Sequence, residues 1–103
     1  MQAQPDYDPQ NPGETEVFGM DFVNELSVGE TIVSASVTLQ VVTGTDATPQ
    51  THVNGSATIS LSKVSQSIGG LLVNVTYRVI FTVVTNKGQT IILYSHVRCV
   101  PIT

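Results

Sequence analysis

The sequence predicts an all-β fold, an immunoglobulin-like β-sandwich of about seven strands with an extended N-terminal arm. Several segments alternate apolar and polar residues with a period of two and are rich in β-branched side chains, which is typical of strands with one buried face. No segment shows helical periodicity over about ten residues. The chain has 103 residues, a common length for a single domain. The antibody type of sandwich is excluded, because the chain has no Trp and only one Cys.

Residues 1–14 contain three of the five prolines and few residues that would enter a core. Each proline fixes φ and lacks an N–H donor, so the segment suits neither a helix nor a central strand. We therefore expect residues 1–14 to form an extended arm and residues 15–103 to form the sandwich domain.

The first strand is predicted over residues 15–23, where Phe18, Met20 and Phe22 alternate with other residues. Residues 24–30 indicate a loop or one helical turn. Residues 31–43 give the clearest pattern of one polar and one apolar face. The apolar face is predicted to hold Val33, Ala35, Val37, Leu39 and Val41.

The middle of the chain is predicted to hold loops and one weaker strand. Residues 44–50 are typical of a loop, and Asn54-Gly55 is typical of a tight turn. Ala57, Ile59 and Leu61 alternate with Thr58, Ser60 and Ser62, which predicts a further strand, and the Gly69-Gly70 pair marks a break before the last segment.

Residues 71–100 predict a long hairpin whose register follows from its own sequence. The apolar side chains of both strands fall on odd numbers. A three-residue loop, Asn86 to Gly88, pairs Thr85 with Gln89 and keeps odd residues opposite odd ones. This loop needs its third residue in the left-handed region, where Gly88 stands.

This register predicts an unusual outward face. The predicted pairs are Arg78 with His96, Thr76 with Arg98, Ile80 with Tyr94 and Thr82 with Ile92. Arginine and tyrosine beside aliphatic residues is the composition of a protein interface. The candidate interface residues are Arg78, Ile80, Ile92, Tyr94, His96, Arg98 and Tyr7.

Three interpretations of that face stay open. It contacts another molecule, or a loop or the N-terminal arm covers it, or it is an ordinary scattered surface. In the second case Asp6 and Asp8 would pair with Arg78 and Arg98, and Tyr7 would pack beside Tyr94.

The charges are unevenly distributed along the chain. All eight acids lie in the first 46 residues and all four bases in the last 41, which sums to −4. The opposite signs meet within one molecule, or an acidic and a basic surface join neighbouring copies head to tail. The negative total argues against nucleic acid as a partner. No apolar run is long enough for a membrane span, and no secretory signal follows Met1.

The sequence offers no catalytic, metal or cofactor site. His52 and His96 are 44 residues apart, and neither has a His or Cys at metal-ligand spacing. Ser95 and His96 are adjacent on a strand, so their side chains point to opposite faces and cannot form a nucleophile–base pair. Cys99 falls in the apolar phase of the last strand and is expected to be a buried small hydrophobe.

Several stretches together resemble the small fibre–tail adaptor proteins of phage virions. They are FGMDF after a proline-bearing start, GETIVSASVTL, the stretch from Gly70 to Val79, and the NKG turn before the terminal strand. The resemblance covers roughly residues 14–100. The sequence departs from it by Val37, where the family pattern has Trp, and by an inserted GTDATPQ loop.

The resemblance implies a non-enzymatic virion subunit in a symmetric ring or adaptor at the tail. Its partners would be other copies of the chain and other tail or fibre proteins, assembled in the host cytoplasm. We expect the subunit to join them through strand faces and the N-terminal arm. The alternative function is a carbohydrate- or cell-surface-binding β-sandwich. Such modules present exposed aromatic rings, and Tyr94 is the clear outward one here. An enzyme ranks third, because neither a nucleophile–base pair nor a ligand set is found.

Overall fold

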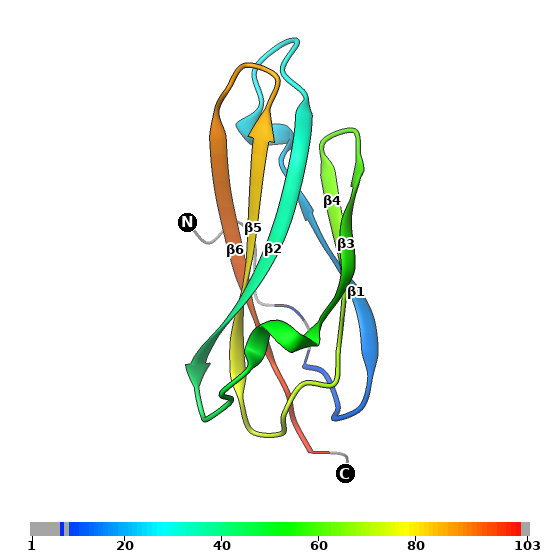
Figure 1. Cartoon of the computed structure of the whole chain (residues 1–103), viewed down its shortest axis with the longest axis vertical. Coiled ribbons are helices and arrows are strands. Elements are labelled where there is room, and N and C mark those ends of the chain that lie inside the picture. The colour runs from blue at the N-terminus through cyan, green and yellow to red at the C-terminus, as the bar shows by residue number, and fades with distance from the viewer. Residues whose placement is uncertain (1–6, 8, 102–103) are drawn as a thin grey trace.

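The computed structural model describes Tyr7 and residues 9–101 (Figure 1). It is all-β, as predicted, with six strands rather than about seven among these residues. The strands are β1 (Thr15–Asp21), β2 (Ile32–Thr43), β3 (Val53–Ser60), β4 (Lys63–Gly69), β5 (Thr76–Thr85) and β6 (Thr90–Arg98). Two short 3-10 helices are η1 (Val23–Glu25) and η2 (Pro49–His52). The immunoglobulin-like topology stays a prediction.

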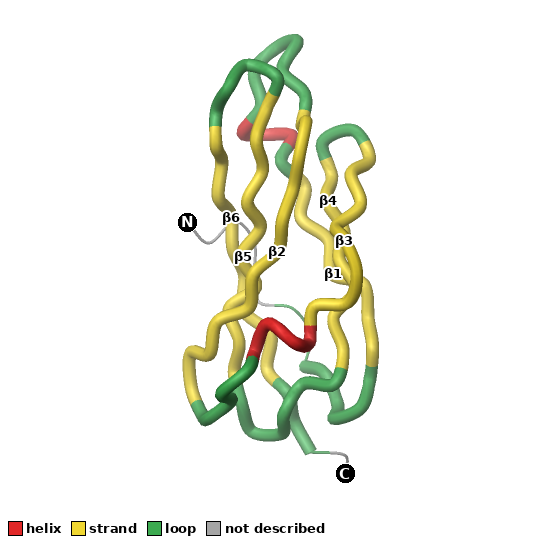
Figure 2. The backbone as a smooth tube through the Cα atoms, viewed as in Figure 1, coloured by secondary structure: helices red, strands yellow, loops and turns green. Residues whose placement is uncertain are grey.

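The strands form two three-stranded antiparallel sheets, in the orders β1-β4-β3 and β2-β5-β6. The two sheets form the two layers of the fold, and η1 and η2 lie in the connections between them (Figure 2). The core fills the space between the layers because each strand turns one row of side chains inward. The largest fully buried hydrophobic side chains are Tyr77, Phe22, Phe81, Met20 and Ile68.

The β5–β6 hairpin has the predicted register. The Thr85 N–H donates to the Gln89 carbonyl at 2.9 Å, and Gly88 has φ +78°. Arg78 lies opposite His96 and Thr76 opposite Arg98. The first strand of this hairpin, β5, is shorter than predicted, because residues 71–75 form a loop before it.

One prediction about β2 is wrong. Val33 is 62% exposed instead of lying on the buried face. The register between β2 and β5 shifts between Ile32 and Ser34, so Val33 is the extra residue of a bulge. A bulge changes the alternation, and Ile32 packs against the core in place of Val33.

The middle of the chain also differs from the prediction. Asn54 and Gly55 lie inside β3, where the register with β4 is irregular, and the reversal occurs after Ser60 instead. Of the predicted apolar row, Ala57 packs against the core, whereas Ile59 and Leu61 are 37% and 92% exposed. β4 supplies buried side chains in its place, among them Val64 and Ile68.

The described part of the arm lies along β6. The backbone N–H groups of Tyr7 and Gln10 donate to the carbonyls of His96 and Arg98, both at 2.8 Å, and Gln10 pairs with Cys99 in parallel. The predicted pairing of Asp6 and Asp8 with the arginines falls outside the described residues. The division into an arm and a domain at residue 14 stays a prediction.

Neither of the helical segments found in the described part of the chain has the length and apolar character that a membrane crossing requires.

Candidate assembly surface

Six of the seven candidate interface residues project from the outer face of the β2-β5-β6 sheet. Burial alternates along β5, where Tyr77, Val79 and Phe81 are fully buried and the residues between them are partly exposed. The same alternation along β6 buries Leu93, Ser95 and Val97. We call the outward set the outer-face patch. Its members are Arg78, Ile80, Ile92, Tyr94, His96 and Arg98.

The cationic half of the outer-face patch is built around Arg78. Its guanidinium carbon lies 4.9 Å from the centre of the Tyr94 ring, within the range of a cation–π contact. Its Nε donates to His96 Nε2 at 3.4 Å, and the rings of Tyr94 and His96 are 5.6 Å apart. Among the described residues, no carboxylate forms an ion pair with Arg78 or Arg98. The patch therefore presents positive charge that no described acid neutralises.

The other half of the patch is apolar. Ile92 on β6 is 50% exposed, and Val84, which lies next to the patch at the end of β5, is 38% exposed. Ile80 lies between this half and the cationic half, opposite Tyr94. A flat sheet face with exposed aliphatic residues beside an arginine–tyrosine pair has the composition of an interface core with a polar rim.

Arg98 and His96 also border a small hollow of about 240 Å³ between the arm and β6. Pro9 and Thr76 line the same hollow. Arg98 is exposed at this end of β6, so its guanidinium group is open to solvent beside the arm.

Tyr7 lines the same hollow as His96 and Arg98, but its ring is directed to the opposite sheet instead of packing beside Tyr94, where the interpretation of a covering arm placed it. Its ring packs edge-on against Phe18 of β1, with centroids 4.8 Å apart. Its hydroxyl donates to the Gly19 carbonyl at 2.8 Å, and burial raises the pKa of this hydroxyl well above its usual range. Tyr7 thus joins the arm to β1 of the opposite sheet, while the backbone of the arm bonds β6.

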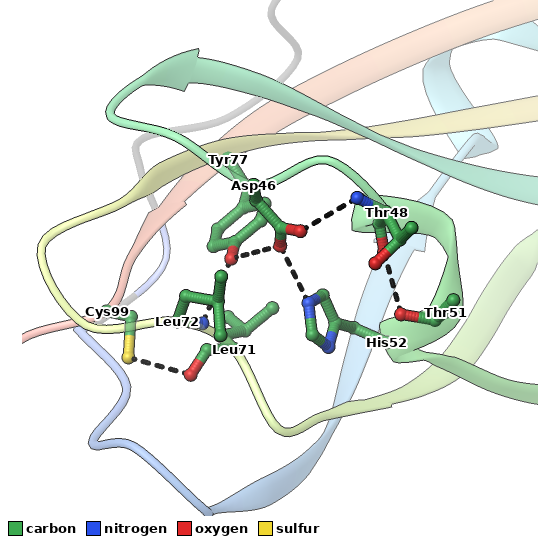
Figure 3. Close-up of polar contacts among 8 residues, drawn as sticks. All are labelled: Asp46, Thr48, Thr51, His52, Leu71, Leu72, Tyr77 and Cys99. Carbon is green, nitrogen blue, oxygen red and sulfur yellow. Dashed lines mark hydrogen bonds and ion pairs between the residues drawn. The ribbon is translucent and has the colours of Figure 1, made fainter.

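A second polar cluster, which the sequence did not predict, ties the loop after β2 to β5 (Figure 3). Asp46 Oδ2 accepts hydrogen bonds of 2.7 Å from both the Tyr77 hydroxyl and His52 Nε2. Its Oδ1 accepts from the Thr48 N–H at 3.0 Å. The Leu72 N–H in turn donates to the Tyr77 hydroxyl oxygen at 3.0 Å.

The Asp46 side chain is only 3% exposed, so its charge depends on these partners. Burial by itself would raise the pKa of Asp46, but the hydrogen bonds from Tyr77, Thr48 and His52 outweigh it and hold the pKa below its usual range. Sequence reasoning missed this cluster because Asp46 and Tyr77 are far apart in the chain. The one local signal was a histidine following an aspartate within a short loop.

Neither Ser95 nor Cys99 offers an exposed nucleophile beside the cluster. Ser95 is fully buried on the inner face of β6. Cys99 is buried as predicted, and its Sγ donates to the Leu71 carbonyl at 3.4 Å (Figure 3). Among the residues that the structure describes, no group of three His, Cys, Asp or Glu side chains could hold a metal ion. The contacts of Asp46 therefore fit a structural role, in which they hold the loop after β2 against β5.

Residues 10–94 match the family model described as podophage GP4 fiber-tail adaptor protein gp77. The chain belongs to this family. It is a structural adaptor protein of the bacteriophage tail, which confirms the resemblance found in the sequence. No curated protein and no solved structure matches the chain.

The family match divides the adaptor's outer-face patch. It includes the Arg78–Tyr94 pair and the exposed aliphatic residues, and it ends before His96 and Arg98. It also includes Gln10 but not Tyr7. The apolar half of the patch and the arginine–tyrosine stack thus lie within the part of the chain that matches the family.

Proposed function

We propose that the adaptor is a non-enzymatic subunit that joins neighbouring tail and fibre proteins through its outer-face patch. The observation that carries this proposal is the stack of Arg78 on Tyr94, beside half-exposed Ile92 and with no described acid paired to the arginine. Arginine and tyrosine, with tryptophan, are enriched among the residues that dominate binding energy in protein interfaces.

The geometry of the patch suits a preformed docking face. Stacking on Tyr94 restricts Arg78, so less conformational entropy is lost when a partner's carboxylate binds the guanidinium group. The rigid sheet beneath holds Ile80 and Ile92 at fixed positions. A partner with an acidic rim and an apolar centre would complement this face.

Several copies in a symmetric arrangement would multiply individually weak contacts. The separation of acids and bases along the sequence supports contacts between unlike surfaces of adjacent copies. A net charge of −4 favours protein partners over nucleic acid. We place the assembled subunit in the virion and its assembly in the host cytoplasm.

The carbohydrate-binding alternative has less support. A sugar-binding site needs an aromatic face free for stacking, and the guanidinium group of Arg78 lies over the ring of Tyr94. A sugar would have to displace that contact before it could bind.

The test is sedimentation of the purified adaptor with tail and fibre proteins of its phage. The double variant Arg78→Glu/Arg98→Glu should weaken complex formation roughly tenfold or more while lowering the melting temperature by only a few degrees, as expected from loss of the stack on Tyr94. The control Lys63→Glu/Lys87→Glu makes the same change in net charge outside the patch and should leave the complexes intact. A large loss of monomer stability in the first variant, or complexes as strong as those of the parent, would overturn the proposal.

A further inference from the structure

The sandwich has an open side between β2 and β3. Each of these strands is the edge of its own sheet, and the two are not hydrogen-bonded to each other. In Figure 1 the β3–β4 turn stands apart from the upper part of β2. Two hollows follow one another along these strands, one of about 250 Å³ beside Ala35 and Ala57 and one of about 460 Å³ beside Ile32 and Ile59. We call them together the β2–β3 groove.

Apolar side chains line the upper part of this groove without a covering layer. Ile59 pairs with Val64, which is fully buried, so both side chains lie on the same face of the sheet. Ile59 is nevertheless 37% exposed, because β3 is the edge strand of its sheet and no further strand lies beside it. Leu61 at the turn is 92% exposed and has φ +55°, a conformation that a leucine rarely adopts. Together with Ile59 it leaves a contiguous apolar surface exposed at this end of the groove.

A side chain already occupies the lower part of the β2 edge in the manner of a strand. The Gln50 amide accepts a hydrogen bond from the Leu39 N–H at 3.1 Å and donates one to the Val37 carbonyl at 3.0 Å. These are the two bonds that the C=O and N–H of one residue in a parallel neighbouring strand would make. The edge of β2 therefore binds amide groups where one is offered.

The next backbone groups along that edge have no such partner. Alternate residues of a strand direct their N–H and C=O groups to the same side, so those of Ala35 point the same way as those of Val37 and Leu39. Among the described residues, none bonds the Ala35 N–H, the Ala35 carbonyl or the Val37 N–H on this side. The unpaired groups begin where the Gln50 amide stops.

We propose that the β2–β3 groove receives an extended strand of another tail or fibre protein. Its backbone pairs with β2 at Ala35 and Val37, and its alternate apolar side chains cover Ile59 and Leu61. Small residues at the level of Ala35, Gly55 and Ala57 leave room for larger incoming side chains there. The added strand would extend the β2-β5-β6 sheet and complete the open side.

The occupant is a strand of a different protein rather than the arm of a second copy. Three prolines in residues 1–14 leave no run of more than four residues able to donate backbone hydrogen bonds. Tyr7 and Gln10 of the arm are also bound to β6 of their own chain. The arm thus offers neither the donors nor the apolar alternation that the groove requires.

This inference rests on the proposed function only for the class of partner, a tail or fibre protein. The β2–β3 groove is a different surface from the outer-face patch. The probe is a set of overlapping twelve-residue peptides from the tail and fibre proteins of the phage, added to the full chain. We expect at least one peptide with alternate apolar residues to bind with a Kd of about 100 μM or tighter. Binding should slow amide hydrogen exchange at Ala35 and Val37 by roughly tenfold or more.

Two variants in the groove and one matched control test the placement. Ala35→Pro removes a free edge N–H, and Ile59→Asp puts a charge into the apolar lining, so each should abolish peptide binding. Val17→Asp introduces the same charge at a valine that is 70% exposed on β1, and it should bind like the parent. Melting temperatures show whether each variant remains folded, and either groove variant suffices if the other unfolds.

Binding that survives both groove variants, or that leaves exchange at Ala35 and Val37 unchanged, would overturn the inference. So would the absence of any binding peptide, or self-association of the chain that Ile59→Asp abolishes. Arg78→Glu/Arg98→Glu should not affect peptide binding in the groove. Failure of the outer-face patch and failure of the groove are therefore distinguishable.

Discussion

The guanidinium carbon of Arg78 lies 4.9 Å from the centre of the Tyr94 ring, across the β5–β6 pair. This contact is partly exposed, where cation–π pairs contribute about 0.5–1 kcal/mol. A double-mutant cycle with Arg78→Gln and Tyr94→Leu should therefore give a coupling energy in that range in urea unfolding. A cycle of Arg98→Gln with Tyr94→Leu is the control and should be additive. Additivity in both cycles would show that the stack does not order Arg78.

Asp46 predicts a specific dependence of stability on pH. Because hydrogen bonds hold its pKa in the folded chain below the free value of 3.8, the ionised carboxylate stabilises the fold fully above that value. This contribution is lost as the pH falls through the lowered pKa. Asp46→Asn should lower the free energy of unfolding at neutral pH by about 2 kcal/mol, since hydrogen bonds to a charged group are replaced by neutral ones.

The measurement for Asp46 is urea unfolding of parent and variant from neutral pH down to the acid limb. The difference between them should shrink as the pH falls below the free pKa of 3.8. Glu25→Gln, at an exposed acid in η1, is the matched control and should match the parent at neutral pH. A difference that stays constant with pH would mean that the charge of Asp46 contributes nothing.

The sequence predicted the hairpin well because two independent constraints agreed there. The odd-numbered apolar rows and the left-handed glycine of the loop both require Thr85 opposite Gln89, and the structure has that pair. The outward position of Arg78, Tyr94 and Arg98 then followed without further assumptions. A register fixed by both burial and turn chemistry leaves no alternative pairing.

Prediction from the sequence failed where the alternation of apolar and polar residues was interrupted, or where a polar residue took a buried position. The alternation on β4 is weak, because Gln66 is fully buried and hydrogen-bonds to the carbonyl of Asn54. The bulge in β2 has no marker in the sequence such as glycine or proline. The Asp46 cluster depends on contacts across the fold, which no local pattern reports.

The bulge at Val33 predicts unequal effects of two identical substitutions in β2. Val37 is 5% exposed and packs in the core, so Val37→Ala should cost about 2 kcal/mol through lost burial and a cavity. Val33 is 62% exposed, and Val33→Ala should change stability by less than about 0.5 kcal/mol. Unfolding in urea measures both. Equal losses would show that Val33 lies on the buried face, as the uninterrupted alternation predicted.

Gly88 has φ +78°, with nothing within 4 Å of the position that a Cβ would occupy. Gly88→Ala therefore meets no steric neighbour, and its cost comes from the backbone alone. The left-handed conformation of an L-residue costs roughly 1–2 kcal/mol, so the variant should be destabilised by about 1 kcal/mol. Gly88→Asn should recover part of this loss, because asparagine tolerates that region better.

Gln89→Ala, which keeps the backbone bond to Thr85, serves as the control and should unfold like the parent in a thermal melt. If Gly88→Ala were as stable as the parent, the hairpin would not depend on the left-handed residue, and the register would follow from burial alone.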